Sequence, residues 1–144
     1  MRFAGYAAIF GRPDRGGDVV RRGAFARSLR RAAGAVPLLW QHDWARPVGR
    51  IEYLKEDRRG LRVIARLSGG RGGREAAALL REGTVAGLSF GYRVRKTAGH
   101  DGAAGLRELT DLELVEISLV TLPMQPRARV HAVEAAAPGR PSGR

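Results

Sequence analysis

Residues 106–120, LRELTDLELVEISLV, form the stretch that most limits the possible folds of this chain. In a strand, alternate side chains point to opposite faces. Both sets are apolar here: Leu112, Leu114 and Val120 on one face, and Val115, Ile117 and Leu119 on the other. A strand that is apolar on both faces is typical of one buried on both sides. We therefore expect this strand to be buried on both faces within a β-rich domain.

Other segments carry strand or helix patterns of ordinary length. Strands are predicted over 2–10, 36–40, 48–57, 59–68 and 84–96, with a hairpin turn at Asp57–Gly60 and a glycine-rich loop over 97–105. Short amphipathic helices are predicted over 23–34 and 75–83, the second preceded by a Gly/Arg-rich connector. The strands do not alternate regularly with helices. The predicted fold is mainly β (α+β), a helix-decorated, mostly antiparallel β-barrel of about six or seven strands.

The 144 residues, of which 44% are hydrophobic, suit one domain over 1–132. The remaining residues, 133–144, are rich in Pro, Gly, Ala and Arg, and we expect them to be disordered. There is no cysteine, and the three histidines, His42, His100 and His131, are scattered, so we expect neither a metal nor another cofactor. No apolar run approaches the roughly 18 residues that span a bilayer, so no membrane partner and no export are expected.

The formal net charge is +12, and only Lys55 and Lys96 are lysines. A GC-rich genome, which favours arginine codons, and contact with a polyanion both explain such a composition. A basic surface raises affinity for any nucleic acid without specifying a function. Because no basic stripe is interleaved with aromatic residues, no specific nucleic-acid partner is expected, and a plain nucleic-acid-binding barrel ranks last among the functions considered.

Ser89 stands between two glycines in AGLSFGY, residues 86–92. Strand parity places Gly87, Ser89 and Gly91 on one face, and the apolar Leu88 and Phe90 on the opposite, core-facing side. A hydroxyl flanked by glycines suits a nucleophile that an extended peptide must approach closely, with Gly87 and Gly91 leaving room for the substrate backbone. The structural alternative is that the glycines admit a closely packed helix. The string matches G-x-S-x-G, but the continuing apolar run predicts a strand rather than the strand-to-helix elbow of hydrolases.

His42 and Glu116 are the other two candidate catalytic residues. His42 follows an apolar strand, with Trp40 two residues before it on the same side, and an imidazole at such a rim suits a general base. Asp43 points the other way in a strand and is expected to bind the following loop. Glu116, on the face of Leu112 and Leu114, needs a partner to be buried, either an arginine in a structural pair or His42 in a catalytic triad with Ser89.

Several blocks of the chain, in order, resemble the prohead (capsid maturation) proteases of tailed phages, including the versions in prophages and gene transfer agents. They are GYAAIFGRPDRGGDVVRRGAF, LLWQHDWARPVGRI, REGTVAGLSFGYRV and LELVEISLVTLPMQPRARV, and together they span residues from about 3 to 130. The resemblance implies a fold like that of herpesvirus assemblins and a serine endopeptidase activity. It matches His42 to the family's general base and Ser89 to its nucleophile. The acidic third member falls on Glu116; the herpesvirus enzymes use a second histidine, which here would be His100 or His131.

The resemblance also implies a biological setting. Such proteases act inside the immature capsid in the bacterial cytoplasm. They cleave the scaffolding segment of the major capsid protein, or a separate scaffold, and often themselves, which would suit the tail after Val130. A homo-oligomer within the prohead is expected. The alternative is an inactive assembly factor of the same fold that binds scaffold or nucleic acid through its basic surface.

Overall fold

The computed structural model describes residues 1–101 and 106–134, which fold mostly into β-structure with one α-helix. This much of the predicted fold class is confirmed. The strands are β1 (Arg2–Ile9), β2 (Asp18–Val20), β3 (Pro37–Trp40), β4 (Asp43–Glu56), β5 (Gly60–Leu67), β6 (Gly87–Asp101), β7 (Leu106–Val120) and β8 (Val130–Val133). The helix is α1 (Arg71–Glu82), and two short 3-10 helices are η1 (Ser28–Arg30) and η2 (Ala33–Ala35).

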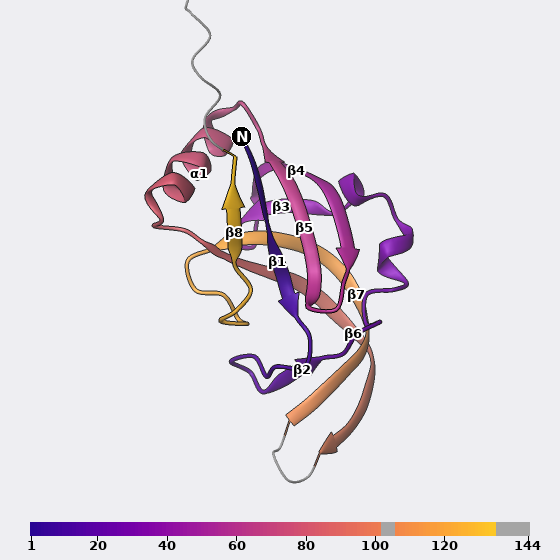
Figure 1. The fold of residues 1–144 in the computed structure, drawn as a ribbon. Coiled ribbons are helices and arrows are strands. Elements are labelled where there is room, and N and C mark those ends of the chain that lie inside the picture. The colour runs from indigo at the N-terminus through magenta and orange to yellow at the C-terminus, as the bar shows by residue number, and fades with distance from the viewer. Residues whose placement is uncertain (102–105, 135–144) are drawn as a thin grey trace, which may run out of the picture.

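The strands form one sheet in the order β2-β7-β3-β4-β5-β1-β8, with β6 paired to β7 (Figure 1). The sheet is mixed, because β2 and β3 each run parallel to β7 while the other pairs are antiparallel. Only an isolated bridge, between Gly87 and Arg129, links the start of β6 to the segment before β8. The sheet is therefore not closed by a continuous ladder, and the closed, mostly antiparallel barrel that we predicted is not confirmed.

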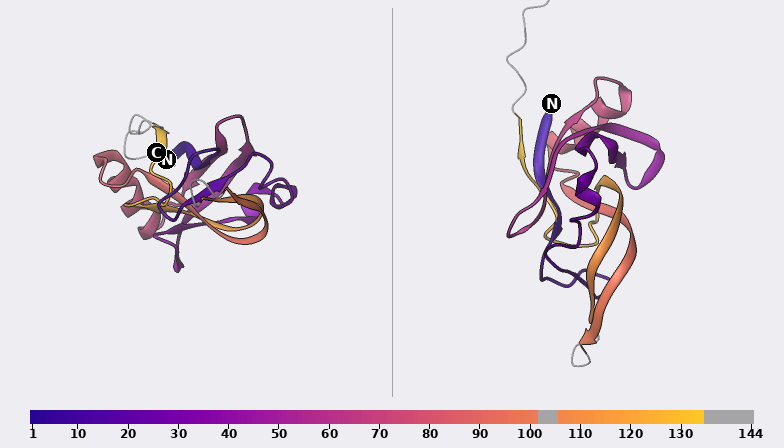
Figure 2. Two further views of the ribbon diagram at one scale, coloured as in Figure 1. Left: turned by 90° about the horizontal axis from the view of Figure 1, so that it is seen from below. Right: turned by 90° about the vertical axis from the view of Figure 1, so that its right-hand side faces the viewer.

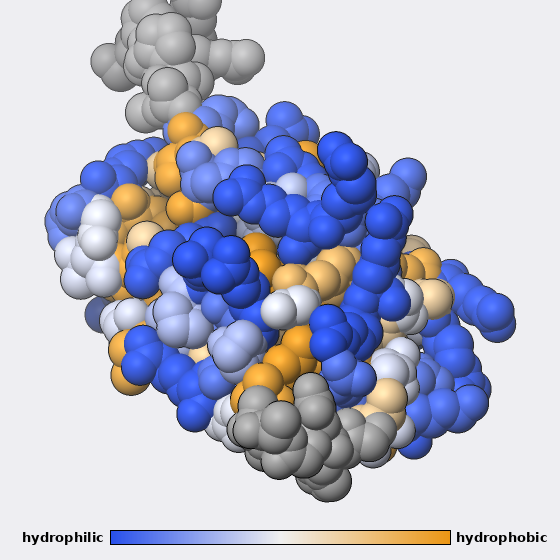
Figure 3. All heavy atoms as spheres, turned by 60° about the horizontal axis from the view of Figure 1, so that its bottom comes forward, coloured by the Kyte–Doolittle hydropathy of each residue, from blue (hydrophilic) through white to orange (hydrophobic). Residues whose placement is uncertain are grey.

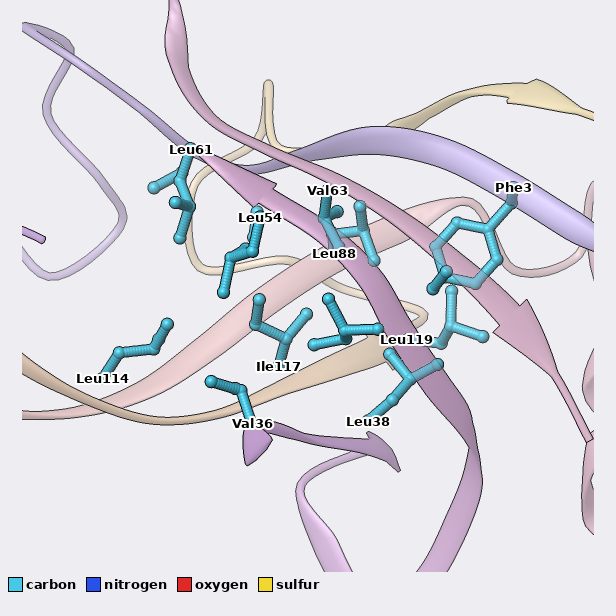
Figure 4. Packing of buried hydrophobic residues seen from close by; sticks show 14 of the residues in the cluster. Phe3, Val36, Leu38, Leu54, Leu61, Val63, Leu88, Leu114, Ile117 and Leu119 are labelled. Atoms are coloured by element: carbon cyan, nitrogen blue, oxygen red, sulfur yellow. The ribbon is translucent and has the colours of Figure 1, made fainter. Parts of the chain in front are cut away.

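In the core, side chains of β1, β4 and β5 pack against those of β3, β6 and β7 (Figure 4). Its largest fully buried side chains come from every part of the chain: Phe3, Phe25, Leu38, Leu39, Ile51, Leu61, Leu88, Leu109, Leu112, Leu114, Ile117 and Leu119. Five of them belong to the strand predicted to be apolar on both faces, which is β7. Burying a Leu or Ile side chain contributes roughly 1.5–3 kcal/mol, so this cluster is the main stabilising element of the fold.

β6 and β7 form a long antiparallel ribbon whose far end projects from the body of the domain (Figure 2). β6 continues to Asp101, beyond the point where we predicted a loop. The ribbon is interrupted where Gly91 pairs with Glu116 but Tyr92 pairs with Leu114, which leaves Val115 without a partner. Val115 is thus a β-bulge, and a bulge reverses the side-chain alternation that follows it. Consequently Glu116 faces away from Leu112 and Leu114, contrary to the face that strand parity predicted.

The predicted helix over 23–34 is wrong. The segment consists of turns and the two 3-10 helices, because tertiary hydrogen bonds replace helical ones. The Glu56 carboxylate accepts the N–H groups of Gly23 and Phe25, and Ser28 Oγ donates to the Leu112 carbonyl and accepts the Leu114 N–H. The segment is therefore bound to β4 and β7 rather than to itself.

The predicted helix over 75–83 is present but begins earlier. α1 starts at Arg71, within the predicted connector, and ends at Glu82. The next residue, Gly83, has a φ of 77°, the left-handed conformation typical of a residue that stops a helix. The predicted hairpin is confirmed as β4 and β5, closed by the Asp57 carboxylate, which accepts the N–H groups of Arg59 and Gly60.

The chain beyond the core remains paired for a few residues. β8 pairs with β1 through Val133, and the Glu134 N–H donates to the Arg2 carbonyl at 2.8 Å. Residues 135–144, most of the tail predicted to be disordered, lie outside the described residues.

Candidate active site

His42 lies in the two-residue turn between β3 and β4, not at the end of a strand as we predicted. Trp40 pairs with Asp43 across the turn, and Gln41 and His42 have φ angles of 50° and 61°. Positive φ at both central residues is typical of a type I′ hairpin turn, where Asn and Gly are the usual residues. Non-glycine residues in this conformation cost about 1–3 kcal/mol each and concentrate at functional sites. Contacts with neighbouring residues must therefore offset the conformational free energy that the positive φ angles of Gln41 and His42 cost.

Two backbone contacts with β7 fix the turn. The Gln41 N–H donates to the Leu119 carbonyl at 2.9 Å, and the His42 N–H donates to Ser118 Oγ at 3.0 Å. These bonds continue the parallel pairing of β3 with β7 beyond Trp40. The Arg46 guanidinium lies over the Trp40 ring, 5.8 Å from its centroid. Asp43 binds the following segment as predicted, accepting the Ala45 N–H at 2.9 Å.

The His42 ring contacts Glu116 through Nδ1, which is hydrogen-bonded to the carboxylate oxygen Oε1. Glu116 is 2% exposed, whereas the His42 side chain is 45% exposed. The hydrogen bond from the imidazole to Glu116 raises the pKa of His42 above its ordinary value, against the opposing effect of partial burial. With Nδ1–H donated to Glu116, Nε2 is left with a free lone pair, the arrangement of a general base. No arginine pairs with Glu116 in the part of the chain that the structure describes, so the structural Glu–Arg alternative is not found.

Ser118 is a residue of this cluster that the sequence reasoning missed. It is fully buried, and its hydroxyl donates to Glu116 Oε2 at 2.6 Å while accepting the His42 N–H. One hydroxyl therefore orients both the carboxylate and the backbone of the turn. The signal for it in the sequence is a polar residue two positions after Glu116 in an otherwise apolar run, and hence on the same strand face.

Ser89 is brought to this cluster by the β6–β7 register, in which it pairs with Ser118. It is 7% exposed and, with His42, lines a cavity of about 350 Å³. Among the described residues its hydroxyl has no hydrogen-bond partner, although no fully buried polar side-chain atom there lacks one. The hydroxyl is therefore open to the cavity, where an incoming group can reach it. The structure brings all three predicted catalytic residues to one face of the β6–β7 ribbon.

The two glycines beside Ser89 face other parts of the same chain. A Cβ atom at Gly91 would lie 2.6 Å from Glu116 Oε1, and one at Gly87 would lie 2.8 Å from Pro123 Cδ. Close packing of Glu116 and Pro123 accounts for both glycines, although the packed neighbour is not the helix that we considered. A role of Gly87 and Gly91 in binding substrate stays a prediction and would have to use their backbone.

The loop before β2 and β2 itself also line the cavity, through Arg12, Asp14, Arg15, Asp18 and Val20. Asp18 accepts two hydrogen bonds from Arg107, at 2.9 and 2.8 Å, and one from the Tyr92 hydroxyl at 3.3 Å. The bond to Arg107 lowers the pKa of Asp18, and burial with nearby carboxylates raises the pKa of Tyr92 to about 12. Leu122 and Met124, which are 67% and 50% exposed, add apolar surface at the rim. The cavity is thus suited to an apolar side chain near its mouth.

Of the two alternative histidines, His131 lies apart from the cluster. His131 lies on β8, where Arg62 donates to its Nε2 and the Tyr6 ring lies 5.8 Å away. The backbone of His100 belongs to β6, and its side chain lies outside the described part of the structure. Within residues 1–101 and 106–134, no three His, Asp or Glu side chains gather as metal ligands would. None of the helices found there is long and apolar enough to cross a membrane.

A family model described as "Caudovirus prohead serine protease" matches residues 1–138. The chain belongs to this family. It is 34% identical over 134 residues to the prohead protease of Enterobacteria phage HK97, covering 92% of this chain and 60% of that protein. It is also 32% identical over 129 residues to the capsid polyprotein of Pseudomonas phage PAJU2, covering 85% of this chain and 18% of that protein. The chain therefore spans less than two thirds of the length of either relative.

Two solved structures share the fold of this prohead protease family member. The bacteriophage T4 capsid assembly protease superposes with a TM-score of 0.68 at 14% identity, covering 85% of this chain and 82% of that one. The varicella-zoster virus protease superposes with a TM-score of 0.54 at 15% identity, covering 90% of this chain and 62% of that one. The predicted likeness to herpesvirus proteases is confirmed at the level of the fold.

Proposed function

We propose that this chain is a serine endopeptidase of prohead maturation in which Ser89, His42 and Glu116 form the catalytic triad. The observation that carries the proposal is the hydrogen bond between His42 Nδ1 and the buried Glu116, beside a cavity that both His42 and Ser89 line. A family model that covers most of the chain supports the same activity.

In this mechanism Ser89 Oγ attacks the carbonyl carbon of the scissile peptide bond while His42 Nε2 takes the hydroxyl proton. Glu116 keeps the imidazole in the tautomer with hydrogen on Nδ1 and stabilises the imidazolium that forms. His42 then delivers the proton to the leaving amine, and an acyl-enzyme remains on Ser89. Water, deprotonated by His42, hydrolyses this ester and restores the serine hydroxyl.

The proposed substrate is the scaffolding segment of the major capsid protein, or a separate scaffold, and the protease itself. The proposed setting is the immature capsid in the bacterial cytoplasm, where a homo-oligomer would form. Two relatives are named as a prohead protease and a capsid polyprotein, which supports a capsid-related partner.

Replacing Ser89 with alanine tests the assignment. Co-expressed with its cognate capsid protein, the wild-type chain should shorten that protein, whereas Ser89→Ala should leave it full length, because loss of a triad member reduces kcat by roughly 10⁴–10⁶-fold. Ser68→Ala, at an exposed serine outside the cavity, is the matched control.

A fluorophosphonate probe gives an independent reading, since it should label the wild type and Ser68→Ala but not Ser89→Ala. Unchanged cleavage by Ser89→Ala would overturn the nucleophile. Absence of both cleavage and labelling in the wild type would favour the inactive assembly factor.

A further inference from the structure

A second cavity, of about 600 Å³, lies beside the end of β1. Its wall is dominated by five arginines: Arg12, Arg58, Arg59, Arg127 and Arg129. Apolar surface comes from Ile9, Phe10 and Pro126. In Figure 3, where the lower end of the molecule is turned forward, hydrophilic side chains surround smaller apolar patches.

These arginines carry charge that the described part of the chain does not neutralise. Ten ion pairs link other residues, and none of the five arginines takes part in one. The carboxylate of Asp57, close to the cavity through Tyr6, is already bonded to the Tyr6 hydroxyl and to the Arg59 and Gly60 N–H groups. Five cations around one concave surface repel one another, and an anion bound there would relieve the repulsion.

The pKa of His131, which also lines this cavity, is affected by the same arginine charges. Arg62 donates to its Nε2 at 2.9 Å, which requires an unprotonated acceptor nitrogen. Partial burial lowers the pKa of His131, and the charges of Arg62 and Arg59 lower it further. The cavity therefore remains an arginine site with a neutral histidine rather than gaining a sixth cation.

The arginine cavity adjoins the cavity of the candidate active site, because Ile9 and Arg12 line both. We propose that the arginine cavity binds an acidic segment of the polypeptide whose scissile bond lies at Ser89, and so selects the substrate at a distance from the cleaved bond. This inference rests on the proposed function. Arginine matches carboxylates in geometry as well as charge, which makes Asp- or Glu-rich sequence the fitting ligand.

The aromatic groups of the cavity favour a peptide over a nucleic acid. Sequence-tolerant binding of single strands uses exposed aromatic faces on which bases stack. Here the Tyr6 ring is covered by the guanidinium groups of Arg59 and Arg62, 5.6 and 5.8 Å from its centroid. Phe10 packs against the buried Phe25, with ring centroids 6.5 Å apart. Neither ring is available as a stacking platform.

Binding is tested on the full chain carrying Ser89→Ala, so the result does not depend on catalysis. The probe is a short fluorescein-labelled peptide of alternating Glu and Gly, measured by fluorescence anisotropy at low and high salt. Adding Arg58→Glu and Arg127→Glu should weaken binding about tenfold or more and flatten its salt dependence. The side chains of these two exposed arginines form no hydrogen bond or ion pair among the described residues, and the one bond of Arg127, from its backbone N–H to Gln125, does not depend on the side chain, so the change should not disturb the fold.

The matched control carries Arg74→Glu and Arg81→Glu on α1, which changes the net charge equally outside both cavities. It should bind as tightly as the parent. Equal weakening by both double variants would overturn the site in favour of a general charge effect. If the acidic variants unfold in a thermal melt, Arg58→Gln with Arg127→Gln replaces them. A duplex DNA of the same net charge that binds more tightly than the peptide, and is lost with the same variants, would overturn the peptide assignment.

A cleavage assay separates this proposal from the proposed function. On the active chain, Arg58→Glu with Arg127→Glu should lower kcat/KM for an acidic protein substrate at least tenfold and leave a short neutral peptide unaffected. Loss of both activities would place the arginines in the catalytic machinery and overturn the inference. If no substrate is cleaved by any variant but the anisotropy result holds, the proposed function fails while the acidic-peptide site stands.

Discussion

The Ser118 hydroxyl donates a 2.6 Å hydrogen bond to the Glu116 carboxylate, and both side chains are buried. The same oxygen accepts the His42 N–H, so Ser118 couples the conformation of the β3–β4 turn to the orientation of the acid. We regard Ser118 as a positioning residue, because it acts through His42 and Glu116.

Ser118→Ala should lower kcat about tenfold or more, because a buried carboxylate oxygen and the turn N–H both lose their partner, at roughly 1–3 kcal/mol for each unsatisfied group. Ser118→Thr, which retains the hydroxyl, should recover part of the loss. The matched control is Ser28→Ala, which removes another buried hydroxyl that bridges β7 backbone groups. Comparable loss of Tm in the two alanine variants, with kcat reduced only in Ser118→Ala, supports the positioning role. Equal kcat values would contradict it.

The pH dependence of activity should reflect the raised pKa of His42. The general base must be neutral, so kcat/KM should fall as the pH drops through a value above 6.5, the ordinary value for histidine. In Glu116→Gln this acid limb should move to lower pH, because the stabilising partner of the imidazolium is lost, and kcat should fall by about 10⁴-fold. A pH–rate profile of both proteins tests this. An acid limb at the same pH in both would show that Glu116 does not stabilise the protonated form of the general base.

The same pair predicts a pH-dependent contribution to folding stability. Because the folded-state pKa of His42 is raised, the contribution is fully present below the ordinary value of 6.5 and is lost as the pH rises through the folded-state pKa. Denaturant unfolding of wild type and Glu116→Gln should therefore differ more at pH 5 than at pH 9. A difference independent of pH would indicate that the hydrogen bond does not depend on the charge of His42.

Gly91→Ala and Gly87→Ala should separate activity from stability. At Gly91 the added Cβ meets the Glu116 side chain rather than backbone, so the carboxylate should be displaced from His42 and Ser118, and kcat should fall far more than Tm does. At Gly87 it meets the Pro123 ring and the Val120 carbonyl, both rigid, so the variant should lose about 1–3 kcal/mol of stability. Thermal melts and kcat measurements on both variants test this contrast. The reverse pattern would rule out the packing explanation.

Asp18→Asn should weaken the attachment of β2 to the sheet. Asp18 and the partly exposed Arg107 form a bidentate ion pair across the parallel β2–β7 contact, and we expect a loss of about 1 kcal/mol at neutral pH. Since this pairing lowers the pKa of Asp18, its contribution is present above the ordinary value of 3.8 and is lost as the pH falls through the lowered pKa. Denaturant midpoints of the two proteins should thus converge in strong acid. A constant gap across the pH range would contradict the ionic origin.

The periodic and local features of the fold could be predicted from the sequence. The apolar run of β7 indicated a buried strand, and the Asp57–Gly60 turn indicated the hairpin of β4 and β5. Local patterns fail where long-range contacts decide the conformation. The segment around Ser28 has a helical pattern, but hydrogen bonds to β4 and β7 prevent the helix.

The sequence indicated which residues gather at the candidate site, but not how they are arranged there. Ser89, His42 and Glu116 stand out because each is polar in an apolar or glycine-rich setting. Strand parity placed Glu116 on the wrong face, because the unpaired residue Val115 reverses the side-chain alternation. Nothing in the amino-acid sequence distinguishes this bulge from a regular strand. The positive φ angles of Gln41 and His42 were equally hidden, since neither residue type is typical of such a turn.

Because β7 pairs with β2, β3 and β6, the candidate site cannot form before β7 has been synthesised. His42 and Glu116 are separated by 74 positions, and their contact requires the parallel pairing of β3 with a strand that is synthesised much later. Contacts of such long sequence separation form late, after the loop-closure entropy has been overcome. A nascent chain that has passed Ser89 therefore carries both the serine and the histidine before β7 exists to bring Glu116 to His42. The order of the strands delays the assembly of the site until nearly the whole domain has been made.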